Sequence, residues 1–124
     1  MIVLDLSAAI DWLLQTAAGQ PIENRIYLRG ESLHAPHLLD LEVAQVLRRL
    51  VREAAVSAQR ADQALQDLLS PRVTRYPHFV FLSYIWRFRH NLSVYDAAYI
   101  AHAEKLGATL ITRDAASLLP PPAG

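Results

Sequence analysis

The sequence predicts an α/β fold in which a central, mostly parallel sheet of four or five strands lies between two layers of helices. Short apolar runs at the start, middle and end of the chain have the length of buried strands. Longer segments with apolar residues at helical spacing separate them. The resulting order is strand, helices, strand, helices, strand, helices, strand, which is typical of a parallel sheet covered on both faces.

The composition indicates one compact domain. The chain has 124 residues, of which 52% are hydrophobic and 19% are charged, enough for one core and too few for a second. We expect the domain to span residues 1–119 and the proline-rich end, residues 120–124, to be a disordered tail. The absence of cysteine excludes disulfides and thiolate zinc sites and favours a cytoplasmic protein. We see no signal peptide and no apolar run of about 20 residues, so we expect no membrane association.

The first half of the chain predicts two strands and three helices. In order, they are a strand over residues 1–4, a helix over 7–18, a helix from about 21, a strand over 33–35 and a helix over 37–53. We expect Ser7 to cap the first helix and Gly19 to end it. Pro21 suits the first turn of the second helix, and Pro36 ends the second strand.

The second half predicts three helices and two strands. They are a helix from about 57 to 70, a strand over 72–76, a helix over 79–90, a helix over 93–106 and a strand over 108–112. Pro71 stops the first of these helices. Ser93 and Asp96 form a capping box at the start of the last helix, and Gly107 ends it.

Four acidic side chains stand where acids are rare. Asp5 and Asp114 follow the first and last apolar strands, and Glu42 and Asp96 lie on apolar stripes of predicted helices. Burying an ionised carboxylate costs several kcal/mol unless a cation or strong donors compensate. Since ligands bind at the carboxyl ends of parallel strands, we expect the four acids to share one site.

Each acid also has an ordinary structural explanation. Asp5 and Asp114 precede possible helix starts, Asp96 completes a capping box, and Glu42 fits a glutamate at the edge of an apolar stripe. Asp40 is a reserve candidate for the site. As a group, however, the acids indicate a bound divalent cation. Oxygen ligands without cysteine or a histidine cluster select Mg²⁺ or Mn²⁺. A site that holds either ion can hydrolyse phosphodiesters, because the ion activates water and neutralises developing charge.

Further polar residues accompany this site. Ser7 and Thr112 are expected to hold a carboxylate or a water, although a helix cap and a strand end explain them equally well. His34 and His37 form an H-x-x-H pair, but Pro36 lies between them and no cysteine is present, so a zinc site is not expected.

The charge is compatible with a nucleic-acid partner, although it does not require one. The chain has 12 basic and 12 acidic residues, and a balanced charge first argues against phosphate binding. With four acids committed to a metal, 12 basic residues face 8 acidic ones, and all but Lys105 are arginine. We take Arg48, Arg87 and Arg113 as candidate contacts for RNA or a protein partner. The aromatic and basic residues over 76–90 are explained by core packing or by such a surface.

The chain resembles the VapC toxins of the PIN-domain family. The likeness spans essentially the whole chain and is carried by four segments in order: residues 1–10 (MIVLDLSAAI), 39–49 (LDLEVAQVLRR), 92–101 (LSVYDAAYIA) and 110–114 (LITRD). The resemblance implies a PIN-like three-layer α/β/α fold and a Mg²⁺- or Mn²⁺-dependent endoribonuclease that acts as the toxin of a type II toxin-antitoxin system.

The resemblance also implies roles and partners. The acidic quartet of the family maps onto Asp5, Glu42, Asp96 and Asp114, with Asp5 and Asp96 binding metal and the other two binding it directly or through water. The implied partners are RNA, a VapB-like antitoxin that covers the active-site groove, operator DNA reached only through the antitoxin, and a second copy in a homodimer. Ser117 stands where many relatives have another acid, which puts a second metal in question.

Two other functions remain open. A catalytically idle PIN domain would act as a binding or scaffolding module, and the intact quartet argues against it. A phosphotransfer or receiver domain also places acids at strand ends but usually employs a lysine near the phosphate. The one lysine, Lys105, lies near the end of a predicted helix, and the segment Asp5-Leu6-Ser7 lacks the second acid of a D-x-D motif.

Overall fold

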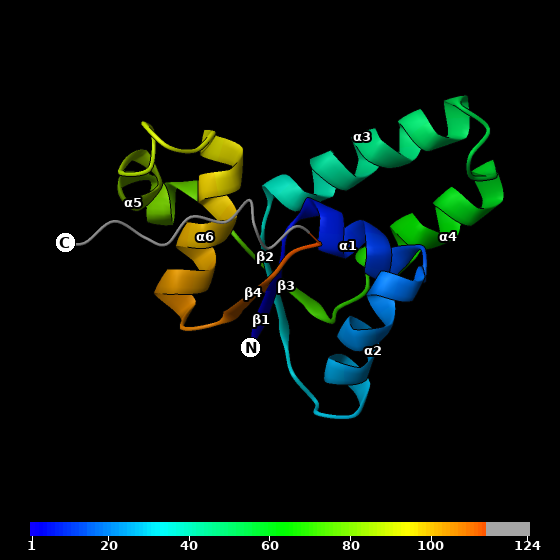
Figure 1. The fold of residues 1–124 in the computed structure, drawn as a ribbon, viewed down its shortest axis with the longest axis horizontal. Coiled ribbons are helices and arrows are strands. Elements are labelled where there is room, and N and C mark those ends of the chain that lie inside the picture. Colours follow the sequence, from blue (N-terminus) through cyan, green and yellow to red (C-terminus); the bar gives the residue numbers. More distant parts are fainter. Residues whose placement is uncertain (114–124) are drawn as a thin grey trace.

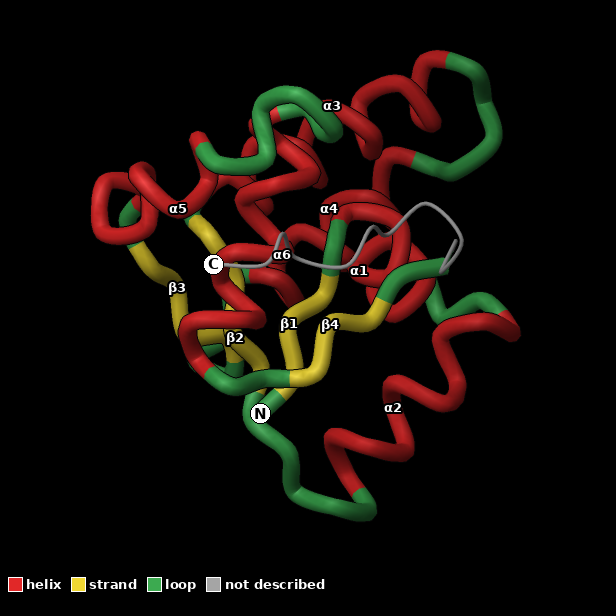
Figure 2. Tube along the Cα trace, turned by 60° about the vertical axis from the view of Figure 1, so that its left-hand side comes forward, coloured by secondary structure: helices red, strands yellow, loops and turns green. Residues whose placement is uncertain are grey.

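A four-stranded parallel sheet forms the centre of the protein. The computed structural model describes residues 1–113. Its strands are β1 (Ile2–Leu4), β2 (Leu33–Pro36), β3 (Val73–Tyr76) and β4 (Thr109–Ile111). Their order is β3-β2-β1-β4, and every pairing is parallel. The first and last of these strands therefore lie side by side, as Figures 1 and 2 show, and the predicted sheet is confirmed.

Helices cover both faces of the sheet. The six α-helices of the described residues are α1 (Leu6–Leu13), α2 (Gln20–Tyr27), α3 (Leu38–Arg52), α4 (Ala58–Leu68), α5 (Leu82–Trp86) and α6 (Val94–Leu106), and the 3₁₀-helices are η1 (Ala17–Gly19) and η2 (His78–Phe81). Helices α1 to α4 lie on one face, while α5 and α6 lie on the other (Figure 1). This is the three-layer arrangement that was predicted. No helix among residues 1–113 is long and apolar enough to cross a bilayer.

Small side chains bring α6 close to the sheet. Ala97, Ala98, Ala101 and Ala103 are all buried on this helix, and β1 is buried along its whole length. A strand buried on both faces reads as a continuous apolar run, which explains why its pattern does not alternate. The close approach matters for function, because α6 carries both Asp96 and Tyr99.

The start of α1 differs from the prediction. Asp5, not Ser7, is the N-cap, and its carboxylate accepts a hydrogen bond from the backbone N–H of Ala8 (3.0 Å). The helix ends at Leu13 rather than at residue 18. After Gln15, whose φ of 57° is left-handed, the backbone N–H of Thr16 donates to the carbonyl of Asp11 (3.0 Å). These contacts turn the chain back before Gly19.

The predicted helix over residues 79–90 is wrong in its extent. It is divided into η2 and the short α5. Beyond Trp86 the backbone bonds reach three residues back, from Phe88 to Ile85 (3.1 Å) and from Arg89 to Trp86 (3.2 Å). These tighter turns carry Phe88 into a small core between α5 and α6, where it is 1% exposed. The start of α6 and its end at Gly107 (φ 65°) are confirmed. The predicted tail and the end of the domain lie outside the described residues.

Candidate active site

Three of the four predicted acids line one pocket. Asp5 follows β1, Glu42 lies on α3, and Asp96 lies in the first turn of α6. Their side chains border a pocket of about 660 Å³, which we call the acid pocket. The backbone N–H of Asp5 donates to the carbonyl of Ile111 on β4 (3.1 Å). The expected meeting of the two strand ends is therefore confirmed, while Asp114 itself lies outside the described residues.

Asp5 is held by a set of short hydrogen bonds. The hydroxyl of Ser7 donates to Oδ1 of Asp5 (2.8 Å), the same oxygen that caps α1. Ser7 in turn accepts from the backbone N–H of Arg113 (3.1 Å) and lies 3.4 Å from the hydroxyl oxygen of Thr112. Ser7 therefore holds the carboxylate of Asp5, and Thr112 lies beside Ser7. Within residues 1–113, Oδ2 of Asp5 receives no hydrogen bond and remains available to a ligand.

Glu42 has a different partner. The hydroxyl of Tyr99, a residue of α6 that is only 3% exposed, donates to Oε1 of Glu42. Burial raises the pKa of Glu42, the hydrogen bond from Tyr99 opposes this, and the charges of Asp96 and Asp5 raise the pKa further. Burial and the neighbouring Glu42 also raise the pKa of Tyr99 above its usual range. The phenol thus stays protonated and remains a donor. Sequence reasoning missed Tyr99, although it stands one helical turn after Asp96.

Asp96 lies in the first turn of α6, next to the cap of this helix, and also borders the acid pocket. Its backbone N–H donates to the hydroxyl of Ser93 (3.1 Å), so Ser93 caps α6 as predicted. The Asp96 residue itself is exposed, and its carboxylate borders the acid pocket. The cap fixes where α6 begins and therefore where this carboxylate stands.

A second buried acid supports the same region. Asp11 on α1 is 3% exposed and accepts two hydrogen bonds from the guanidinium of Arg113, from Nε (2.7 Å) and Nη2 (2.5 Å). Thr16 donates a third (2.8 Å). The hydrogen bond from Arg113 is the main cause that lowers the pKa of Asp11. Asp11 interrupts an apolar helical run, the same feature that identified the other acids, so the sequence contained the information needed to find it.

Comparison with known proteins identifies the family. The family model of the PIN domain matches residues 2–117. The ribonuclease VapC9 of Mycobacterium tuberculosis is 42% identical over 114 residues, which cover 92% of this chain and 86% of that protein. The chain belongs to the VapC group of the PIN-domain family. Ribonuclease VapC12 of the same organism is 40% identical, with 92% of this chain and 87% of that protein covered.

Solved structures share the fold of this PIN domain. The crystal structure of VapC20 from M. tuberculosis, a toxin that cleaves the sarcin-ricin loop, has a TM-score of 0.66 at 16% identity and covers 94% of this chain and 92% of its own. VapBC2 from Rickettsia felis, solved with a DNA fragment from its promoter, has a TM-score of 0.61 at 12% identity and covers 92% and 89%. At these identities the likeness supports the fold alone.

The predicted arginines of the VapC chain lie in different places. Arg113 borders the acid pocket but is paired with Asp11. Arg48 lines a separate groove between α3 and α4, and the guanidinium of Arg87 lies 5.7 Å from the centre of the Tyr84 ring. Arg49, which was not among the predicted contacts, also borders the acid pocket.

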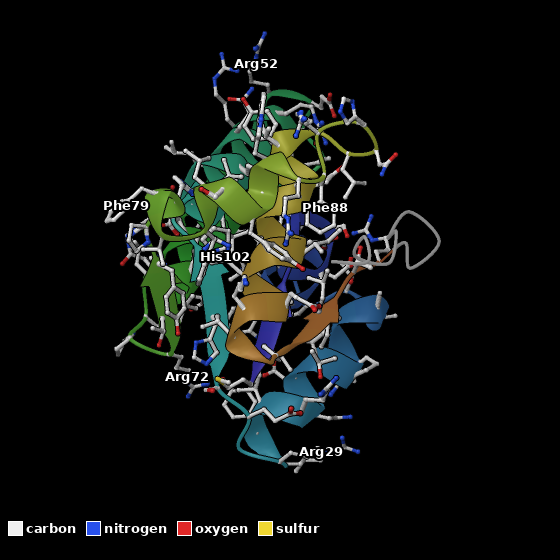
Figure 3. All side chains as sticks on the ribbon, turned by 90° about the vertical axis from the view of Figure 1, so that its left-hand side faces the viewer. Arg29, Arg52, Arg72, Phe79, Phe88 and His102 are labelled. Carbon is white, nitrogen blue, oxygen red and sulfur yellow. The ribbon has the colours of Figure 1, made fainter. Side chains whose placement is uncertain are left out.

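The remaining candidates have structural roles. The reserve acid, Asp40, accepts from Nε of Arg75 (2.7 Å). His34 is bonded to the hydroxyls of Ser32 (2.8 Å) and Tyr76 (2.6 Å). In the aromatic segment, Phe88 is buried, as core packing predicts, whereas Phe79 is 78% exposed (Figure 3).

The residue types of the acid pocket fit a hard divalent cation. Among residues 1–113 no three His, Asp or Glu side chains are close enough together to hold a metal ion. Asp5, Glu42 and Asp96 nevertheless share one pocket, and after burial the charges of Asp96 and Asp5 add to the raised pKa of Glu42. Carboxylate oxygens are the ligands that Mg²⁺ and Mn²⁺ prefer. A cation there would relieve the repulsion between the acids.

The raised pKa of Glu42 predicts a pH effect on stability. Between 4.5, its usual value, and the higher pKa in the folded protein, the folded state binds more protons than the unfolded state. Glu42 therefore lowers stability as pH rises through this window. We expect Glu42→Gln to gain in melting temperature over the wild type from pH 4.5 upward when both are measured in EDTA. A difference that is constant from pH 4 to 8 would contradict this.

Proposed function

We propose that this VapC protein is a Mg²⁺- or Mn²⁺-dependent endoribonuclease and the toxin of a VapBC system. The observation that carries the proposal is that Asp5, Glu42 and Asp96, from three different elements, line one pocket at the carboxyl end of β1. The ribonuclease names of relatives that are 40–42% identical over 92% of the chain support the activity. The placement of three carboxylates in one pocket favours this function over a catalytically idle binding module.

Asp5 and Asp96 are the proposed metal ligands, and Glu42 and Asp114 bind the metal directly or through water. When bound by these residues, a divalent cation would supply an activated water and would neutralise charge on the scissile phosphate. The residues of the chain prepare the site for it. Ser7 and the N–H of Ala8 orient the carboxylate of Asp5, and the Ser93 cap fixes the start of the helix that carries Asp96.

Cations at the rim of the pocket suit an RNA backbone. Arg49 is exposed on α3, and its Nε lies 4.0 Å from Glu53, a distance at which an exposed ion pair contributes little. The guanidinium of Arg49 is thus free to exchange this contact for a phosphate, which its planar donors can bind in a bidentate manner. We propose that Arg49, in addition to Arg113, contacts the phosphates that flank the cleaved bond.

RNA cleavage that depends on a divalent cation tests the proposed function. We expect the purified toxin to cut structured RNA with Mg²⁺ or Mn²⁺ and to lose this activity in EDTA, because carboxylates alone cannot neutralise a phosphate. Adding excess Mn²⁺ after EDTA should restore cutting. Cleavage that EDTA leaves unchanged would exclude the metal-dependent mechanism.

The acid pocket also suits a protein partner. Beyond the acids it continues over apolar side chains of α1, of α3 and of the turn after it, among them Ile10, Leu14, Val46, Leu50 and Val56. We propose that a VapB-like antitoxin covers this groove, and that operator DNA is reached through the antitoxin. Co-expression of the toxin with its antitoxin should yield a complex that does not cleave RNA.

A homodimer is proposed from the exposed apolar side chains. Leu41 on α3 is 75% exposed, and Phe79, Leu82 and Trp86 on η2 and α5 are 55–78% exposed. Contact with a second copy would remove such exposed apolar side chains from water. The mass of the free toxin in solution, measured by light scattering, should correspond to two chains.

A further inference from the structure

The two pocket acids nearest the sheet share one feature. Asp5 and Glu42 each have one carboxylate oxygen bound by donors of the protein, whereas no hydrogen bond reaches the other oxygen within residues 1–113. In Asp5 the donors are local, since Ser7 and Ala8 follow it in the chain. In Glu42 the single donor, the hydroxyl of Tyr99, comes from a helix 57 residues further along the chain.

The side chain of Tyr99 is largely buried and lines the acid pocket. Tyr99 is 3% exposed, and its ring belongs to the main hydrophobic core. The packed ring holds the hydroxyl at the acid pocket, where its O–H donates to Oε1 of Glu42. Asp96 stands three residues earlier on α6, and residues three apart lie on the same side of a helix. One helix thus supplies both an acid of the pocket and the donor that holds a second acid.

Glu42 needs such a donor more than Asp5 does. A glutamate side chain has one more rotatable bond than aspartate, and Glu42 is only half-buried at the edge of α3. Without a fixed donor its carboxylate can swing away from Asp5 and Asp96 to relieve their repulsion. The interhelical hydrogen bond opposes this movement, and within residues 1–113 it leaves Oε2 without a hydrogen bond.

We propose that Tyr99 is a positioning residue of the active site, which holds Glu42 so that its free oxygen binds the divalent cation or a water on it. This role rests on the proposed function. In this role Tyr99 acts through Glu42, because a hydrogen bond to a metal ligand fixes the orientation of that ligand.

Mn²⁺ affinity of the full chain tests this role without an activity assay. The free Mn²⁺ signal in electron paramagnetic resonance is measured for the wild type, Tyr99→Phe, Glu42→Ala and the double variant. Tyr99→Phe keeps the buried ring and removes only the hydroxyl. Loss of a hydrogen-bond partner that orients a metal ligand typically costs about 10- to 100-fold in metal affinity. We expect a loss in this range, and no further loss when Tyr99→Phe is added to Glu42→Ala.

Tyr76→Phe is the matched control. It also removes a tyrosine hydroxyl with a side-chain partner, since Tyr76 bonds to His34 (2.6 Å), but it does not border the acid pocket. Its Mn²⁺ affinity should equal that of the wild type. A merely structural role for Tyr99 would lower the melting temperature and leave Mn²⁺ affinity unchanged.

The outcomes separate this role from the proposed function. Unchanged Mn²⁺ affinity in Tyr99→Phe, or an equal loss with and without Glu42, overturns the positioning role while the wild type still binds Mn²⁺. A wild type that binds no Mn²⁺ and cuts no RNA overturns the proposed function, and the role of Tyr99 with it. If Tyr99→Phe does not fold, Glu42→Asp replaces it, because its shorter side chain withdraws from Tyr99. Unchanged affinity in Glu42→Asp overturns the role.

Discussion

Replacing Asp96 by Asn is expected to reduce RNA cleavage about 10³-fold or more and to abolish growth arrest. A metal supplies several kcal/mol of charge stabilisation in the transition state, and each 1.36 kcal/mol corresponds to a tenfold change in rate. The amide of Asn keeps the size of the side chain but not its charge. The cap of α6 is preserved, because it depends on the hydroxyl of Ser93 and the backbone N–H at position 96.

Asp5→Asn should reduce RNA cleavage to a similar extent, although Asp5 has a second, structural role. Asp5 also caps α1, and Asn is as good an N-cap as Asp. The variant should therefore lose activity while its melting temperature stays close to that of the wild type. Glu104→Gln, on the exposed side of α6, is the matched control and should cut RNA at the wild-type rate. Full activity in both Asp variants would exclude the acid pocket as the site of cleavage.

Arg113→Ala is expected to lower the free energy of unfolding by about 2–3 kcal/mol. Removing one partner of a buried ion pair costs about 3–5 kcal/mol because it leaves a buried charge without compensation. Asp11 is 3% exposed and, within the described part of the chain, would keep only Thr16 as a side-chain donor. The side chain of Arg113 is 55% exposed, so solvent screening reduces the expected loss below that range.

The pH dependence of this loss gives an internal check. The pKa of Asp11 is held below its usual value of 3.8 chiefly by the hydrogen bond from Arg113. The pair therefore stabilises the protein fully above about pH 4, and its contribution disappears as pH falls through the lowered pKa. The difference in urea-unfolding free energy between wild type and Arg113→Ala should be largest near pH 7 and shrink below pH 4. Arg49→Ala, an exposed cation, should cost less than about 0.5 kcal/mol. Equal losses in the two variants would contradict the account.

The sequence predicts those parts of the fold that depend on local pattern. The apolar runs identify β1 and β4, and the Ser93 cap and Gly107 bound α6 correctly. Three acids of the site follow from their position beside or within apolar segments. Each of these predictions rests on the few residues around it.

The errors come from contacts between distant segments. Ser7 and Asp5 are both good N-cap residues, and Asp5 is the cap because the hydroxyl of Ser7 donates to it and accepts from the backbone of Arg113, 106 residues away. The pattern over residues 79–90 is helical, but Phe88 is buried between α5 and α6, and the turns after Trp86 tighten.

The same reason explains the residues that were missed. The Asp11 pair requires Arg113 to lie beside α1, which follows from the neighbouring positions of β1 and β4. The hydrogen bond between Tyr99 and Glu42 requires α3 and α6 to meet at the acid pocket. Neither meeting can be read from local spacing, because it depends on the completed sheet.

The chemistry at the cut ends tests the central claim most directly. If the carboxylates and a divalent cation activate water, water attacks the phosphorus and the cleaved RNA carries an acyclic phosphate end. Cleavage in H₂¹⁸O should then place one ¹⁸O atom in that phosphate, as mass spectrometry of the products measures, and EDTA should abolish the products. A 2′,3′-cyclic phosphate without ¹⁸O, formed equally well in EDTA, would mean that the ribose hydroxyl attacks instead and would contradict the proposed mechanism.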